Sequence, residues 1–155
     1  MRTTKAACAM ALMALLMLAG CLQTGAPNPF GRGTLLLERQ NTTLQVELAS
    51  TPAQTERGMM RRTSLDEDKG MLFDMGSTAT QSFWMYNTLI PLDAIFFDEQ
   101  MRVVDIQTME PCGQTDPARC PLYVSRAPAR YVLEVNAGFS ERHDVREGDR
   151  MRLGG

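Results

Sequence analysis

Short segments with a strand-like pattern of apolar and polar residues follow one another from residue 34 to the end of the chain. Segment 43–49 alternates Leu44, Val46 and Leu48 with polar residues, the period of a half-buried strand. Segment 92–97 is instead apolar at consecutive positions, so we expect it to be covered on both faces and to lie centrally in a sheet. The same reasoning predicts further strands at 34–38, 70–73, 82–86, 102–107, 123–125, 131–135 and 150–153.

Helical signals are few and short. Thr51, Pro52 and Gln54 have the order of a capping box with proline in the first turn, and we expect this helix to end near Gly58. A second helical turn is predicted within 138–143. About eight short strands with one or two short helices predict a mainly β, single sandwich-like or barrel-like domain.

The first twenty residues break this pattern. Fifteen of them are apolar, and the only charges are Arg2 and Lys5. The uncharged run at 6–19 is shorter than the ~20 residues of a permanent membrane span, so it is typical of a secretory signal. We therefore divide the chain into a signal at 1–20, an anchor and flexible tether at 21–33, and a β domain at 34–155.

The end of the signal is more specific. Leu18-Ala19-Gly20-Cys21 resembles the lipobox of bacterial lipoproteins, in which the cysteine is lipidated and becomes the new N-terminus. That resemblance implies a membrane anchor at Cys21 and, with Leu22 following it in a Gram-negative envelope, an outer-membrane protein that faces the periplasm. The alternative is an ordinary signal peptide with a chance cysteine.

Charge argues against one class of partner. After residue 20 the chain carries 14 basic and 18 acidic residues and no basic run, which does not favour nucleic acid binding. No glycine-rich phosphate loop is present either. We expect no cofactor.

Two cysteines remain for the domain once Cys8 leaves with the signal and Cys21 is lipidated. In an oxidising exported location, Cys112 and Cys120 are expected to form a disulfide worth roughly 2–3 kcal/mol. A metal pair is the alternative, although no nearby histidine or third cysteine completes such a site.

Catalytic signals are incomplete. The one histidine, His143, lies in a charged stretch, and no nucleophile elbow exists for a serine hydrolase. Asp93 and Glu134 each interrupt an apolar strand. On neighbouring strands they could form a carboxylate pair for hydrolysis; alternatively each is hydrogen-bonded to backbone or to an arginine such as Arg61.

The segment around the only tryptophan is the most unusual in composition. Trp84 is followed by Asn87, Thr88 and Asp93, which together could form a concave ligand site with one flat apolar wall, and Arg61 is a candidate charge partner. Trp84 as ordinary core, with Asn87 and Asp93 fixing the loop, is an equal alternative.

Methionine offers a third hypothesis. Eight methionines remain after the signal, and Met60, Met71, Met75 and Met85 could bind Cu(I) through their thioethers. Most of them lie among apolar residues, where methionine ordinarily fills gaps in a core.

Several of these segments together resemble one family. The strings Trp84-Met85-Tyr86-Asn87-Thr88 and Ile90-Pro91-Leu92-Asp93, with Gly58 to Arg62, Gly70 to Phe73 and Tyr131 to Gly138, are similar to the bacterial and archaeal domain of unknown function 192. The resemblance implies a mainly β domain and no established activity. Its motif positions are Met60, Arg61, Gly70, Met71, Trp84, Met85, Asn87, Thr88, Pro91 and Asp93.

Two positions depart from the family pattern. Met59 stands where leucine is usual, and Tyr86 stands where a basic residue is frequent, which weakens an anion-binding hypothesis. The leading expectation is a non-enzymatic binding or accessory domain for a small molecule, glycan or protein. Carboxylate hydrolysis and Cu(I) binding remain the alternatives.

Overall fold

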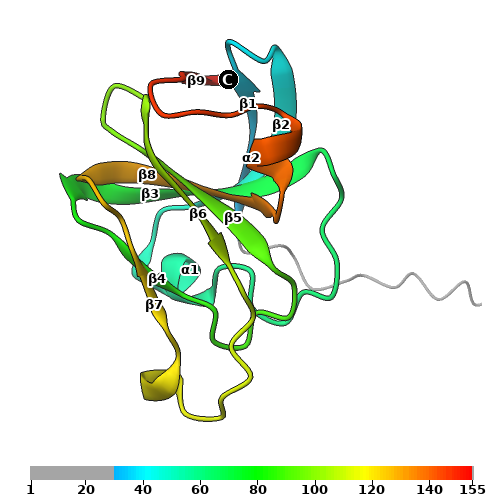
Figure 1. Ribbon diagram of the computed structural model, residues 1–155, viewed down its shortest axis with the longest axis vertical. Helices are drawn as coiled ribbons and strands as arrows, with labels where there is room; N and C mark the ends of the chain where they lie inside the picture. Colours follow the sequence, from blue (N-terminus) through cyan, green and yellow to red (C-terminus); the bar gives the residue numbers. More distant parts are fainter. Residues whose placement is uncertain (1–29, 155) are drawn as a thin grey trace, which may run out of the picture.

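The computed structural model describes residues 30–154, which form a mainly β domain with short helices (Figure 1). The elements are β1 (Gly31–Leu37), β2 (Thr42–Ala49), α1 (Pro52–Arg57), β3 (Lys69–Ala79), β4 (Ser82–Trp84), β5 (Leu92–Phe97), β6 (Val103–Met109), the 3-10 helix η1 (Pro117–Arg119), β7 (Leu122–Val124), β8 (Ala129–Asn136), α2 (Phe139–Arg142) and β9 (Met151–Gly154). The predicted fold class is confirmed. None of the helices within 30–154 has the length and apolar character needed to cross a membrane. The signal at 1–20, the lipidation site Cys21 and the tether as far as residue 29 lie outside the described residues.

Seven strands form one curled sheet in the order β6-β5-β8-β3-β2-β1-β9. Neighbours are antiparallel except β2 and β3, which pair in parallel because the chain crosses over through α1 between them. The sheet curls until its two edges meet. The amide of Val103 donates to Asp149 O at 2.8 Å, and the amide of Met151 donates to Met101 O at 3.0 Å. The domain is therefore barrel-like at this end.

Each face of the central strands carries its own apolar core, because successive side chains of a strand point to opposite faces. In the view of Figure 1, α1 and the small β4–β7 ribbon cover the lower face, while β1, β2, β9 and α2 enclose the upper face. The lower core includes Met71, Phe73, Phe83, Ala94, Phe96 and Val132. The upper core includes Leu72, Ile95, Phe97, Leu133, Val135 and Phe139.

Strand β5 occupies the central position that its sequence predicts. It lies between β6 and β8, and all six of its residues are buried. Phe83 of β4 packs edge-on against Phe73 and Phe96, with ring centroids 5.2 and 6.0 Å apart. Edge-to-face contacts of this kind fix the β4–β7 ribbon against the lower face of the sheet.

Several boundaries differ from the sequence prediction, and three of the differences have a clear structural basis or consequence. Strand β1 begins at Gly31, within the segment expected to be tether, because Gly31 and Gly33 pair with β2 and leave room for the side chain of Leu48. Strand β3 continues to Ala79 through polar, exposed residues that give no apolar signal, and a register shift follows Asp74. The strand predicted at 82–86 ends at Trp84.

Helix α2 is held by the carboxylate of Asp93, which projects from β5 into the upper face. Asp93 is 1 % exposed. Its oxygens accept hydrogen bonds from the hydroxyl of Thr108 at 2.8 Å and from the amides of Gly138 and Ser140 at 3.2 and 2.9 Å. A buried carboxylate with three donors is satisfied, so Asp93 has a structural role at the start of α2.

We predict that Asp93→Asn lowers the free energy of unfolding by about 1–3 kcal/mol, because an amide nitrogen would replace an acceptor that faces a donor. Urea denaturation followed by circular dichroism measures the change. Asp68→Asn is the matched control, since Asp68 is exposed, and we expect it to shift stability by less than about 0.5 kcal/mol. Equal stability of the two variants would contradict the role assigned to Asp93.

Candidate functional site

A narrow pocket lies on the lower face of the sheet, between the end of α1 and strand β8. It is lined by residues 55–59, by Phe73, by Phe83 and Trp84, by Thr88 and by Glu134. Its cavity volume is about 20 Å³. A space of this size holds roughly one water-sized group, so the pocket can receive one end of a ligand and not a whole molecule.

Helix α1 has a defined start and a defined end, and its last turn lies over this pocket. Thr51 caps the helix, and the side chain of Gln54 accepts hydrogen bonds from the Ser50 and Thr51 amides at 3.1 Å, as the predicted capping box requires. The helix ends at Gly58, whose φ of 42° favours glycine. A Cβ at Gly58 would lie 3.4 Å from the ring of Phe73, so glycine also permits the close approach to β3.

Glu134 is the buried acidic residue of the pocket. It pairs with Met71 of β3 and Ala94 of β5, and it is only 4 % exposed. Within residues 30–154 its carboxyl group has no hydrogen bond or ion pair. Burial raises the pKa of Glu134 from 4.5 to about 8, and the nearby positive charge of Arg62 partly opposes this rise. At neutral pH the carboxyl group is therefore mostly protonated.

Arg62 does not neutralise Glu134 because it is paired elsewhere. Its guanidinium donates to both carboxylate oxygens of Glu47, at 3.2 and 2.5 Å. The side chain also lies 5.9 Å from the ring centroid of Phe30. Arg62 therefore acts on Glu134 only through the longer-range electrostatic field of its positive charge.

Two of the residues predicted for a ligand site, Trp84 and Thr88, line this pocket. Trp84 is half-buried at the end of β4, with its ring 5.8 Å from that of Tyr86. Thr88 is 6 % exposed, and its amide donates to Met85 O at 3.2 Å. An aromatic residue and a threonine thus line the same pocket as the buried Glu134.

Arg61 and Asn87 are adjacent to the pocket but do not line it. The amide of Arg61 donates to Asn87 O at 2.8 Å, which joins the loop after α1 to the loop after β4. Both residues have positive φ, 64° and 55°. Asparagine tolerates this conformation better than most residues, so the local backbone accounts for Asn87.

Asp93 is not part of the pocket, and the proposed Asp93–Glu134 pair is wrong. The strands β5 and β8 are neighbours, as that hypothesis requires, but Asp93 pairs with Val135 while Glu134 pairs with Ala94. A one-residue offset places the two side chains on opposite faces of the sheet. The carboxylate hydrolase hypothesis therefore fails, and the alternative of backbone hydrogen bonding is confirmed for Asp93.

The four methionines of the Cu(I) hypothesis do not share one accessible surface. Met71 and Met85 are 0 % and 1 % exposed within the lower core, and Met75 packs against that core. Met60 instead lines a separate hollow beside Arg61. The structure favours the core-packing interpretation of Met71 and Met85.

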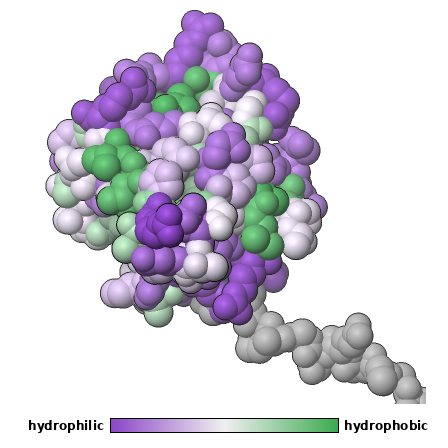
Figure 2. Space-filling model, turned by 60° about the horizontal axis from the view of Figure 1, so that its bottom comes forward, coloured by the Kyte–Doolittle hydropathy of each residue, from purple (hydrophilic) through white to green (hydrophobic). Residues whose placement is uncertain are grey.

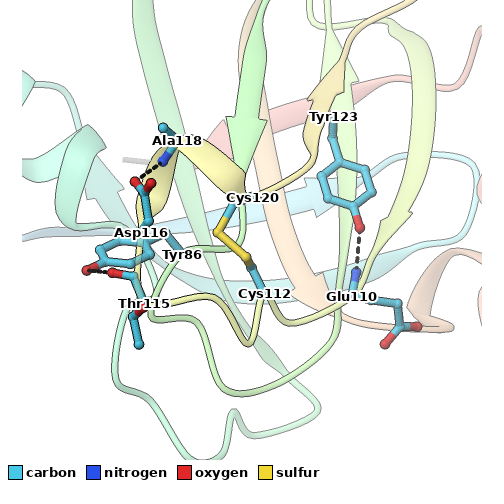
Figure 3. Close-up of a disulfide and its surroundings, with 8 residues drawn as sticks. All are labelled: Tyr86, Glu110, Cys112, Thr115, Asp116, Ala118, Cys120 and Tyr123. Atoms are coloured by element: carbon cyan, nitrogen blue, oxygen red, sulfur yellow. Dashed lines mark hydrogen bonds between the residues drawn. A yellow bond between two sulfur atoms is a disulfide. The ribbon is translucent and has the colours of Figure 1, made fainter.

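A disulfide joins Cys112 and Cys120, which confirms the predicted pairing (Figure 3). The amide of Cys112 donates to Met85 O at 3.2 Å, so the disulfide loop is tied to the segment after Trp84. Tyr123 of β7 accepts a hydrogen bond from the Glu110 amide at 3.0 Å through its hydroxyl oxygen, as Figure 3 shows. These contacts hold the side of the lower layer that presents Trp84.

Larger hollows exist but lack a buried polar group. The hollow beside α1, of about 480 Å³, is lined by Ala53, Glu56, Arg57, Met60 and Arg61. Hollows of about 340 and 450 Å³ lie over β1 and β2 and are lined mainly by exposed or half-buried side chains. In Figure 2 the hydrophobic residues of the visible face form separate small patches among hydrophilic ones. Chemistry rather than size therefore distinguishes the Glu134 pocket.

Comparison with known proteins places the chain in a family. The model of the family DUF192, described as "Uncharacterized ACR", matches residues 35–153. The chain belongs to this family. It is 31% identical over 104 residues to a UPF0127 protein of Thermococcus gammatolerans and 28% identical over 105 residues to one of Thermococcus kodakarensis, matches that cover 67% and 68% of the chain. They span 63% and 62% of these archaeal relatives.

Two crystal structures resemble the domain. One is of a protein from Sinorhizobium meliloti described as a candidate transcription regulator, with 35% identity and a TM-score of 0.69 over 83% of this chain and 98% of that one. The other is of a protein of unknown function from Novosphingobium aromaticivorans, with 31% identity and a TM-score of 0.65 over 79% and 84% of the two chains.

Sequence reasoning missed the end of α1 as part of the site. It grouped Trp84 and Thr88, which both line the pocket, with Asp93, which lies on the other face of the sheet, whereas Glu134 lines the pocket. The glycine that ends a capped helix, Gly58, was the available signal that a helix terminus approaches another element closely. Nothing in the sequence indicated that this element is β3 beside Glu134.

We predict that Glu134 makes stability fall as pH rises. Between about pH 4.5 and 8 the unfolded chain loses the Glu134 proton while the folded chain keeps it, so the free energy of unfolding decreases across this range and levels off above it. At about 1.4 kcal/mol per pKa unit, the full effect is on the order of several kcal/mol.

Urea denaturation of Glu134→Gln and of the unmodified protein from pH 4.5 to 8.5 tests this prediction. The stability of the variant relative to the unmodified protein should increase steadily up to pH 8. Glu110→Gln is the control, since Glu110 is exposed. The difference in the free energy of unfolding between this variant and the unmodified protein should stay constant across the pH range. A constant difference for Glu134→Gln as well would contradict a protonated Glu134.

Proposed function

We propose that this protein is an exported, membrane-anchored binding protein whose β domain holds one end of a ligand in the Glu134 pocket. The observation that carries the proposal is a buried carboxyl group with no partner among residues 30–154, in a pocket with an aromatic wall. Burial of this carboxyl group costs free energy, as its raised pKa indicates. A function that needs the group explains why the fold tolerates this cost.

Binding fits the pocket better than catalysis does. Proton transfer and nucleophilic attack require a second group placed against the first, and Asp93 lies on the other face of the sheet. Glu56 and Arg57 line the outer part of the pocket, but both are exposed on α1. One buried carboxyl group can select a ligand without transforming it.

Export and anchoring are supported by two separate features. Arg2, Lys5 and the apolar run end in the lipobox-like sequence before Cys21. The disulfide between Cys112 and Cys120 suits an oxidising compartment outside the cytosol. In a Gram-negative envelope the domain would face the periplasm from the outer membrane. A role in transcription, as described for the S. meliloti protein, fits poorly with export and with the excess of acidic residues.

We predict that Cys21→Ser releases the protein from the membrane. Expression of the unmodified chain in a Gram-negative bacterium should place it in the outer-membrane fraction, with an acylated N-terminal cysteine detected by mass spectrometry. Cys8→Ser is the matched control and should leave this location unchanged. An unacylated mature chain in the soluble envelope fraction would contradict the anchor.

Trp84 provides a specific test of the pocket, because it is the only tryptophan of the chain. A panel of cell-wall muropeptides, sugars, amino acids and simple amines should contain a solute that changes Trp84 fluorescence saturably. Thr55→Phe should abolish the response by filling the mouth of the pocket, since Thr55 lines it from α1. Thr63→Phe, at an exposed position outside the pocket, should leave the response unchanged.

The contrary result is equally clear. If no solute gives a response that Thr55→Phe removes, and acrylamide does not quench Trp84, the Trp84 cluster is core and the binding proposal is wrong.

A further inference from the structure

Resting on the ligand pocket proposed above, we propose that its occupant is a primary ammonium group that forms an ion pair with the carboxylate of Glu134. A free small amine and a lysine side chain of a partner peptide both present this group. The pocket recognises the shared chemistry, and the experiment below separates the two sources.

The carboxyl oxygens of Glu134 are hydrogen-bond acceptors that suit an ammonium group. Both oxygens of Glu134 lack a hydrogen-bond donor among residues 30–154, and the residue as a whole is 4 % exposed. A primary ammonium offers three donors and the opposite charge. It would satisfy a carboxylate more completely than a hydroxyl or an amide, each with fewer donors and no charge.

The size of the cavity also favours a primary ammonium group. A volume of about 20 Å³ admits a group the size of a water molecule, which a primary ammonium resembles. A planar guanidinium or a quaternary ammonium is larger than this space. A metal ion is a poor alternative, because residues 30–154 contain no group of three or more histidine, cysteine or acidic side chains able to hold one.

The walls favour a cation that is withdrawn from water. Phe73, Phe83 and Trp84 line the pocket, and aromatic faces attract cations through their quadrupoles. The same apolar surroundings lower the local dielectric and strengthen an ion pair. Besides Glu134, the polar residues Thr55 and Thr88 line the pocket.

Among the described residues, no other charge competes with the carboxylate that Glu134 forms when it loses its proton in the inner pocket. Its strand neighbours Met71 and Ala94 are uncharged. Arg62, in the loop after α1, is bonded to Glu47. On α1, Glu56 and Arg57 have opposite charges and are both exposed, so they largely cancel at the mouth.

Binding of an ammonium group must release one proton from Glu134. Glu134 holds a proton at neutral pH, because burial raises its pKa to about 8. The proton leaves the carboxyl group for solvent as the ammonium enters, while the ammonium keeps its three N–H bonds. Affinity should therefore rise as the pH increases towards 8, by up to about tenfold per pH unit.

The test uses the full chain in detergent, methylamine as the probe, and Trp84 fluorescence as the readout. We expect saturable binding of methylamine that strengthens about tenfold from pH 6 to pH 7. Methanol, acetamide and tetramethylammonium should bind at least about tenfold more weakly. Glu134→Gln should weaken methylamine binding by a similar factor, with Glu110→Gln as its control, while calorimetry in two buffers should show release of nearly one proton.

Two results would overturn the inference. If methanol or acetamide binds as well as methylamine, or if Glu134→Gln retains the affinity, the amine assignment is wrong while the pocket proposal stands. If no solute gives a response that Thr55→Phe removes, both proposals are wrong. Tighter binding of a lysine tripeptide, acetylated at its N-terminus with the lysine side chain left free, than of 1,5-diaminopentane would support a peptide source. The reverse order would support a free amine.

Discussion

The proposed function depends on the burial of one carboxyl group, that of Glu134, in the lower layer of the domain. Strand β8 carries it between two uncharged strand neighbours, and α1, Phe73 and Phe83 exclude most of the water around it. Arg62, whose positive charge partly opposes the raised pKa of Glu134, is bonded to Glu47. The carboxyl group therefore keeps its proton at neutral pH and lacks an internal partner among residues 30–154.

A second buried carboxyl group, that of Asp93, has hydrogen-bond partners where Glu134 has none among residues 30–154. It lies one register position away, on the upper face, where three donors satisfy it and it secures α2. The alternation of side chains along β5 and β8 thus separates a structural acid from a candidate binding acid. Their roles follow from the available donors rather than from residue type.

Much of the fold could be predicted from local pattern. The alternation in β2, the continuous apolar run of β5 and the capping box of α1 each depend on neighbouring residues. The site depends instead on long-range register. Whether Glu134 shares a face with Asp93 or with Trp84 is decided by the pairing of β8 with β3 and β5, which no local pattern encodes. The polar end of β3 and the glycines of β1 were missed because pairing, not hydrophobicity, makes them strands.

The measurement that tests the account most directly is an NMR titration of the Glu134 side-chain carbon, with Glu134→Gln used to assign the signal. We predict a single transition near pH 8 in the folded protein without ligand. A transition near pH 4.5, the ordinary value for glutamate, would mean that Glu134 is ionised and hydrated in the fold. That result would contradict the central claim.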